Sequence, residues 1–209
     1  MIVDTHVHIW EMPPIAPIGP TAPRGSGLPT EPGTAELLLE DMDANGVDWT
    51  VIVQTSWSTW DNGYVADSAR KYPDRFVAHG LVDPLDPDNA KTVAYWMDER
   101  GMVGFRFHPS YYHVDDPVEG KILMRPENEA MFETISERSG IIQIHCPFDY
   151  AEQLDYAAKR YPEIKWLIDH MMYPQPEMAQ EDWAPYNPVL ALAQHPNVSI
   201  KISDVHSRS

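Results

Sequence analysis

Short apolar runs and segments of helical pattern alternate along almost the whole chain. We predict strands in residues 2–10, 49–54, 75–82, 103–108, 141–145, 164–170 and 198–203, which are rich in apolar and β-branched side chains. Helices are predicted between them, in residues 34–45, 61–72, 86–100, 126–139, 149–160 and 188–194. Strands that alternate with helices pair in parallel, and right-handed crossovers then give either an open sheet or a closed barrel.

Residues at the ends of two predicted helices support these helix boundaries. Thr34 can cap the first helix, and Asn45-Gly46 can end it. Asp86 is a candidate cap for the helix in residues 86–100, with Pro87 in its first turn and Gly101 after its last residue.

Polar residues collect at the C-terminal ends of successive predicted strands, and this favours the barrel. In a closed barrel these ends surround one mouth, where active sites lie, whereas an open sheet carries such residues only at its switch point. No glycine-rich phosphate loop follows the first strand, which weakens a dinucleotide-binding interpretation. We therefore predict an α/β fold, a TIM-type (β/α) barrel with seven of its eight strands. The polar residues are His6, His8, Gln54, Asp83, His108, His145, His170 and Ser203.

The composition limits the classes of partner. With 209 residues and a net charge of −17, the chain is expected to form a single acidic domain that binds neither nucleic acid nor anionic membranes. The single cysteine, Cys146, excludes an internal disulfide and fits a reducing cytoplasm. A strand that begins at residue 2 leaves no room for a cleavable signal, so a cytoplasmic location is expected.

A proline-rich stretch follows the first strand. Seven prolines lie between residues 13 and 32, which is incompatible with a helix interior or a central strand. Only ten residues precede the stretch, too few for a separate domain. We interpret residues 11–33 as a long loop after the first strand, of the kind that often acts as a lid.

His6 and His8 lie two residues apart in the first predicted strand. Side chains two apart on a strand point to the same face, so both imidazoles could bind one metal ion. The spacing also occurs by chance, and a structural pair of histidines is equally compatible with it. His145 and His170, at the ends of two later strands, strengthen the metal interpretation.

These histidines resemble those of the amidohydrolase superfamily. Further motifs are similar to the amidohydrolase-related branch that contains sugar-lactone hydrolases, pyrone-dicarboxylate lactonases and metal-dependent decarboxylases. The resemblance covers essentially the whole chain and, apart from the proline-rich loop, rests on His8-Ile9-Trp10, Asn45-Gly46-Val47-Asp48, Tyr72-Pro73-Asp74-Arg75-Phe76, Gly104-Phe105-Arg106 and Ile168-Asp169-His170.

The resemblance also implies an element that this sequence lacks. The eighth strand of the family normally carries an aspartate that binds the metal or acts as a base, but this chain stops at residue 209, shortly after the seventh strand. A barrel of this type usually takes about 250 residues. We therefore expect a domain over residues 1–209 that is truncated at its C-terminus, with open edges at its first and last strands.

With the family context, His6, His8 and His145 are the expected metal ligands. Three histidines suffice for a catalytic zinc ion, although manganese or a metal-free reaction is also compatible with the family. His170 is the expected catalytic residue, as an acid–base group or a group that polarises a carbonyl, although a further metal ligand or a packed barrel histidine is also compatible with the sequence. Its neighbour Asp169 is expected to point to the opposite face and to contact a helix or a loop.

Three residues are candidates for binding the substrate. Arg106 could hold a substrate carboxylate through its guanidinium, although a structural ion pair is equally compatible with the sequence. His108, two residues later, could line the mouth or simply end the strand. Trp10 could form a wall of the pocket or lie in the core.

Three functions remain open at this point. The favoured one is a hydrolase that attacks a small lactone or ester carbonyl with a metal-activated water. The second is a metal-dependent decarboxylase of a small unsaturated or aromatic carboxylic acid. The third is an inactive, truncated barrel that pairs with another copy through its open edge. The expected partner of an enzyme of this kind is a small molecule that carries a carboxylate, and the protein could form a homo-oligomer.

Overall fold

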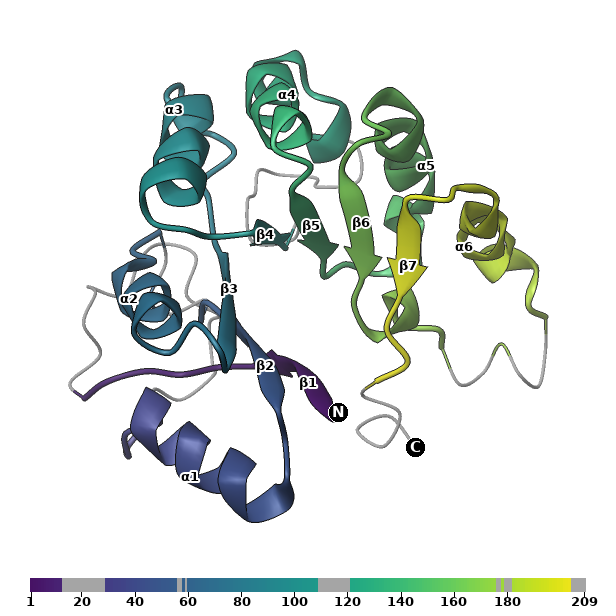
Figure 1. The fold of residues 1–209 in the computed structure, drawn as a ribbon. Coiled ribbons are helices and arrows are strands. Elements are labelled where there is room, and N and C mark those ends of the chain that lie inside the picture. The colour runs from purple at the N-terminus through teal and green to yellow at the C-terminus, as the bar shows by residue number, and fades with distance from the viewer. Residues whose placement is uncertain are drawn as a thin grey trace. The chain divides into compact units, whose positions relative to one another are not determined.

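The computed structural model describes residues 1–12, 29–55, 58, 60–108, 121–175, 178 and 182–203. Most of the predicted proline-rich loop in residues 11–33 therefore lies outside the described residues. Contacts divide the chain into two compact units, and Figure 1 shows the elements of both. Unit 1 comprises Met1–Asp83 and Thr92–Arg106, and unit 2 comprises Pro84–Lys91 and Phe107–Ser209. The extent of the predicted domain stays a prediction.

Strands and helices alternate through the described residues, as the sequence predicts. The strands are β1 (Val3–Val7), β2 (Trp49–Val53), β3 (Phe76–Gly80), β4 (Gly104–Phe107), β5 (Ile141–Ile144), β6 (Lys165–Ile168) and β7 (Val198–Ile200). The α-helices are α1 (Ala35–Asn45), α2 (Gly63–Lys71), α3 (Asn89–Ala94), α4 (Glu129–Glu137), α5 (Ala151–Arg160) and α6 (Asn187–Ala191).

All pairings between these strands are parallel, and within each unit the sheet order is the chain order. In unit 1, β1 pairs with β2, β2 with β3 and β3 with β4. In unit 2, β5 pairs with β6 and β6 with β7. Seven parallel strands alternating with helices form an incomplete TIM-type (β/α) barrel, so the predicted fold class is confirmed.

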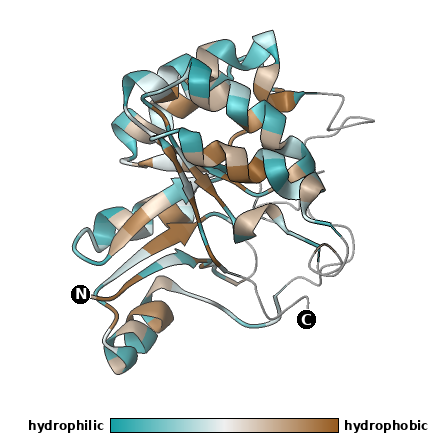
Figure 2. Ribbon diagram, turned by 90° about the vertical axis from the view of Figure 1, so that its right-hand side faces the viewer, coloured by the Kyte–Doolittle hydropathy of each residue, from teal (hydrophilic) through white to brown (hydrophobic). Residues whose placement is uncertain are grey.

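The core lies between the strands and the inner faces of the helices. Ile142, Ile144, Trp166 and Ile168 alternate along β5 and β6 and are almost completely buried. Figure 2 shows that hydrophobic residues concentrate on the strands, whereas the helices carry hydrophobic and hydrophilic residues on different sides. No helix in the described part of the chain has the length and apolar character needed to cross a membrane.

Helix α1 begins and ends where its sequence predicts. The Thr34 hydroxyl accepts a hydrogen bond from the Leu37 N–H at 3.3 Å, which satisfies one of the unpaired donors of the first turn. Gly46 ends the helix in the left-handed conformation, with φ of 68°.

The helix predicted for residues 86–100 was wrong at its start. Asp86 does not cap a helix there, because its carboxylate accepts a hydrogen bond from the Asp88 N–H at 2.9 Å and forms a turn. The helix begins at Asn89, whose buried side-chain amide donates to the Pro84 carbonyl and to Asn128 Oδ1. From Tyr95 to Glu99 the helix continues with π-helical hydrogen bonding.

Asp155 connects α5 to the turn before β7. Its carboxylate accepts hydrogen bonds from Lys159 Nζ at 2.7 Å and from His195 Nε2 at 2.8 Å. Lys159, followed by His195, holds the pKa of the Asp155 carboxyl below its ordinary value of 3.8. Because this pKa is lowered in the folded state, the carboxylate stabilises the fold above pH 3.8, and this contribution disappears as the pH falls through the folded-state pKa.

The Asp155→Asn variant should therefore lose about 1 kcal/mol of unfolding free energy at neutral pH. The loss should shrink as the pH is lowered toward the folded-state pKa of Asp155, because the wild-type carboxylate then also becomes neutral. Thermal unfolding of both proteins over a series of pH values measures this difference. A difference in Tm that stays constant down to the acid end of the series would show that the charge of Asp155 does not stabilise the fold.

Candidate functional site

His6 and His8 meet at the C-terminal end of β1. Their Nε2 atoms are 3.2 Å apart, and the two rings are nearly perpendicular, with an interplanar angle of 86°. His8 Nδ1 is 2.8 Å from the Val53 carbonyl oxygen at the end of β2, so the neutral ring donates a hydrogen bond from Nδ1. Both rings are half-buried. The structure thus directs one nitrogen of each histidine to the same point, as the two-residue spacing predicts.

This pair has the separation that a shared metal ion requires. Zinc–nitrogen distances of about 2.0–2.1 Å and a tetrahedral angle place two ligand nitrogens roughly 3.3 Å apart. A ligating histidine commonly donates its other N–H to a backbone carbonyl, as His8 does to Val53. Within the described ranges, no group of three or more His, Cys, Asp or Glu side chains is arranged to hold a metal ion.

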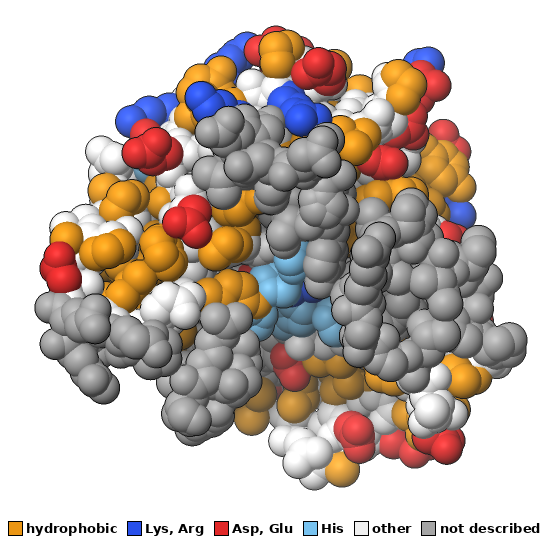
Figure 3. Space-filling view, turned by 180° about the vertical axis from the view of Figure 1, so that it is seen from behind, with side chains coloured by type: hydrophobic (Ala, Val, Ile, Leu, Met, Phe, Trp, Pro, Cys, Tyr) orange, Lys and Arg blue, Asp and Glu red, His pale blue; other side chains and the backbone are white. Residues whose placement is uncertain are grey.

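In unit 2, three histidines and a tyrosine form a second group, the histidine–tyrosine cluster (His108, His145, His170 and Tyr173). The ring centroids of His108 and His145 are 4.1 Å apart, and those of His145 and His170 are 5.2 Å apart. His145 Nε2 is hydrogen-bonded to the Tyr173 hydroxyl. All four rings are half-buried, and histidine side chains are visible at the surface in Figure 3 (pale blue).

An unusual turn after β6 positions His170 and Tyr173. The residues from His170 to Tyr173 all have φ between 50° and 55°, although none of them is glycine. This left-handed conformation costs roughly 1–2 kcal/mol per residue. The turn therefore depends on tertiary contacts, and backbone of this kind is concentrated at functional sites. Sequence reasoning missed Tyr173, and its only signal was its place three residues after His170.

A buried ion pair lies at the ends of β6 and β7. Lys201 Nζ is 3.4 Å from Asp169 Oδ1, and the two side chains are 9% and 0% exposed. Gln143 Nε2, on β5, donates to both Asp169 oxygens at 2.9 Å. Asp169 thus contacts a strand residue and the segment that follows β7. The predicted alternation with His170 does not apply, because β6 ends at Ile168 and His170 already belongs to the turn.

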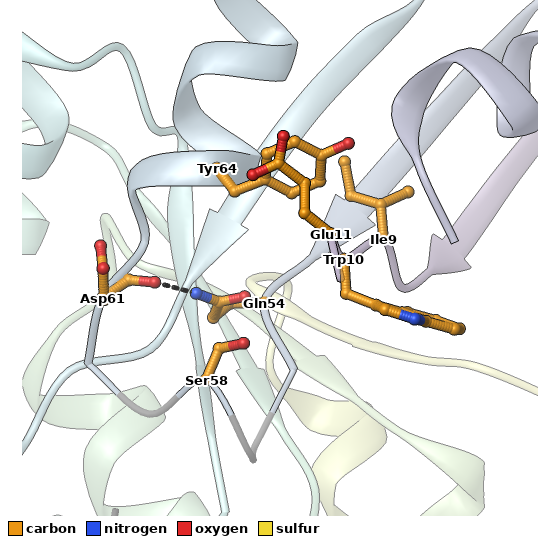
Figure 4. Close-up of a pocket in the computed structure, with 7 residues that line it drawn as sticks. All are labelled: Ile9, Trp10, Glu11, Gln54, Ser58, Asp61 and Tyr64. Atoms are coloured by element: carbon orange, nitrogen blue, oxygen red, sulfur yellow. Dashed lines mark hydrogen bonds between the residues drawn. The ribbon is translucent and has the colours of Figure 1, made fainter. Parts of the chain in front are cut away.

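Trp10 lines a small cavity in unit 1. The cavity has a volume of about 20 Å³ and is lined by Ile9, Trp10, Glu11, Gln54, Ser58, Asp61 and Tyr64. Figure 4 shows Gln54 in the cavity wall, hydrogen-bonded to the Asp61 carbonyl. The Trp10 indole donates to the Glu31 carbonyl at 2.7 Å. A Cβ atom on Gly33 would lie 2.8 Å from the Trp10 ring, so this position leaves no room for a side chain.

The remaining predicted site residues lie on or beside β4. Arg106 is 8% exposed, and a guanidinium that deeply buried requires polar partners. His108 is half-buried directly after the strand, in the histidine–tyrosine cluster. Burial raises the pKa of the Cys146 thiol, which argues against a nucleophilic role for this residue.

The comparisons with known proteins agree with this fold. The family model described as Amidohydrolase matches residues 3–208. No curated protein matches the chain in sequence. Among solved structures, the chain is similar to a probable 2-pyrone-4,6-dicarboxylic acid hydrolase from Acinetobacter baumannii with citric acid bound, with 20% identity and a TM-score of 0.78 over 97% of this chain and 70% of that one.

Two further structures contain metals. An amidohydrolase from Burkholderia multivorans with bound zinc has 18% identity and a TM-score of 0.73, over 100% of this chain and 72% of that one. A 5-carboxyvanillate decarboxylase from Novosphingobium aromaticivorans, in complex with manganese, has 18% identity and a TM-score of 0.64, over 96% and 74%. At these identities the structures establish the fold, and the family model establishes the membership: the chain belongs to the amidohydrolase family.

Proposed function

We propose that this protein is a metal-dependent hydrolase that opens a small lactone or ester, with His6, His8 and His145 as the metal ligands. The observation that carries the proposal is the geometry of His6 and His8. Their Nε2 atoms converge to 3.2 Å while His8 Nδ1 is held by the Val53 carbonyl. The assignment of His145 as third ligand rests on its place in the sequence motif of the family.

Zinc or manganese is the proposed ion, because imidazole nitrogen suits zinc and because relatives of this fold contain one or the other. When bound, such an ion supplies a water molecule whose pKa is lowered toward neutrality, and so a nucleophile at neutral pH. The imidazoles of His6 and His8 must be neutral to bind the ion, and the hydrogen bond to Val53 favours the required tautomer of His8.

Four side chains are proposed to act on the substrate. His170 transfers a proton to or from the reacting oxygen, a role that an imidazole performs near neutral pH. Arg106 and His108 are proposed to bind a substrate carboxylate, and Trp10 to form an apolar wall. A carboxylate-bearing substrate suits a chain with a net charge of −17 only if local cations hold it, and Arg106 is such a cation.

The decarboxylase alternative uses the same groups and is supported by the similarity to 5-carboxyvanillate decarboxylase. The two reactions differ in their products. Lactone hydrolysis releases a proton and no carbon dioxide, whereas decarboxylation releases carbon dioxide and consumes a proton. One set of assays therefore separates them.

The test is a screen of small lactones and aromatic carboxylic acids, with zinc or manganese added, followed by pH-stat titration and by detection of carbon dioxide. Acid release from at least one lactone, without carbon dioxide, is the expected result. Carbon dioxide release would instead support the decarboxylase. Absence of turnover on every compound, together with a mass that rises with concentration in light scattering, would favour an inactive barrel that self-associates.

A further inference from the structure

Ser203, three residues beyond β7, contacts the proposed catalytic histidine. Its hydroxyl oxygen lies 2.9 Å from His170 Nδ1, and both side chains are half-buried. A ring nitrogen engaged in this way no longer serves for proton transfer to a substrate. The reactive nitrogen of His170 must then be Nε2.

Two backbone hydrogen bonds of Lys201 connect the segments that carry His170 and Ser203. The Lys201 N–H donates to the Ile168 carbonyl at 2.8 Å, and the Met171 N–H donates to the Lys201 carbonyl at 3.2 Å. The segment after β7 is thus hydrogen-bonded to the segment after β6, beyond the last residues of both strands. This arrangement places Ser203 two residues after a hydrogen-bonded position at the end of β7.

The buried ion pair provides a second connection between the same segments. Asp169 precedes His170, and Lys201 lies two residues before Ser203. Their contact, with Gln143 bound to both Asp169 oxygens, holds the backbone beside both members of the His170–Ser203 pair. Two adjacent contacts between the strand ends therefore restrict where the His170 ring can lie.

The turn that contains His170 leaves the orientation of its ring to side-chain contacts of this kind. His170 has φ of 50°, a left-handed conformation that is uncommon for residues other than glycine. Within the turn, the Tyr173 N–H donates to the His170 carbonyl at 2.9 Å, which fixes the backbone and leaves the ring to be oriented by side-chain contacts.

We propose that Ser203 is a positioning residue for His170. Its hydroxyl accepts a hydrogen bond from Nδ1–H, which fixes the ring and selects the tautomer in which Nε2 carries the lone pair. His170 then takes the proton of the reaction at Nε2. This inference rests on the proposed role of His170 as the acid–base group, and it adds Ser203 to the residues that the reaction requires.

The test is nitrogen NMR of protein with ¹⁵N-labelled histidine, at about pH 8.5, where an ordinary imidazole is neutral. The His170 signals are assigned by their loss in the His170→Asn variant. In the wild type we expect the proton on Nδ1. The Ser203→Ala variant should shift the signals toward the other tautomer, and Ser203→Thr, which keeps the hydroxyl, should restore the wild-type signals.

A proton on Nε2 in the wild type would overturn the proposal, and so would unchanged His170 signals in Ser203→Ala. Because NMR needs no substrate, this result is independent of whether lactone hydrolysis is found. If hydrolysis is found, Ser203→Ala should lower kcat about tenfold at nearly unchanged KM, and Ser203→Thr should recover most of the loss. Equal losses in both variants would indicate a merely structural role.

Discussion

Replacing His170 with asparagine should lower the kcat of lactone hydrolysis by about 10²- to 10⁴-fold, the usual contribution of a positioned acid–base group. Asparagine suits the test for a structural reason. It tolerates positive φ better than most residues, so the left-handed turn at 50° should survive the change. Its side-chain amide can also still reach Ser203, whereas it cannot transfer a proton near neutral pH.

The control for this variant is His195→Asn, which removes a histidine of the same unit that hydrogen-bonds to Asp155. Its kcat should remain within about twofold of the wild type, because His195 lies outside the proposed catalytic machinery. A His170→Asn protein with nearly full kcat and an unchanged pH profile would contradict the assignment of His170 as the acid–base group.

Removing Asp169 should have the largest effect on stability. The Asp169→Ala variant removes the carboxylate that pairs with Lys201 and accepts two hydrogen bonds from the Gln143 amide, at a position with 0% exposure. Breaking a buried ion pair by deleting one partner typically costs about 3–5 kcal/mol. Unfolding in urea, followed by circular dichroism, measures the loss.

A double variant separates the cost of removing one charge of the ion pair from the cost of an altered side-chain shape. In Asp169→Asn/Lys201→Met both charges are absent, while the volumes of the side chains are nearly kept. Because neutral replacement of a buried pair is often tolerated, this protein should recover most of the stability lost in Asp169→Ala. A loss below about 1 kcal/mol in Asp169→Ala would show that the ion pair does not hold the two strand ends together.

Local signals in the sequence account for much of the fold. Thr34 and Gly46 act within one helical turn of their own position, so α1 could be predicted almost to the residue. Asp86 carried the same signal and was misleading. Its carboxylate bonds to Asp88, and the start of the helix is set by tertiary contacts of the buried Asn89 that no local pattern reveals.

In the candidate site, too, one part could be predicted from a local pattern and another part depends on tertiary contacts. The convergence of His6 and His8 follows from the alternation of side chains along one strand, so two residues of sequence were enough to predict it. The arrangement around His170 depends on four consecutive left-handed residues without glycine and on contacts with Ser203 and Lys201, about thirty residues further along the chain. Such a turn is held by its surroundings, and its own sequence gives no sign of it.

Measuring the metal content shows whether His6 and His8 hold the proposed ion. Protein purified without chelator and reconstituted with zinc or manganese should contain about one ion per chain by plasma mass spectrometry, as expected for a single catalytic site. The His6→Ala/His8→Ala variant should lose this ion, whereas the His195→Asn control should retain it. Absence of metal from the reconstituted wild type, or equal metal in the wild type and the double variant, would contradict a metal-dependent reaction at the β1 histidine pair.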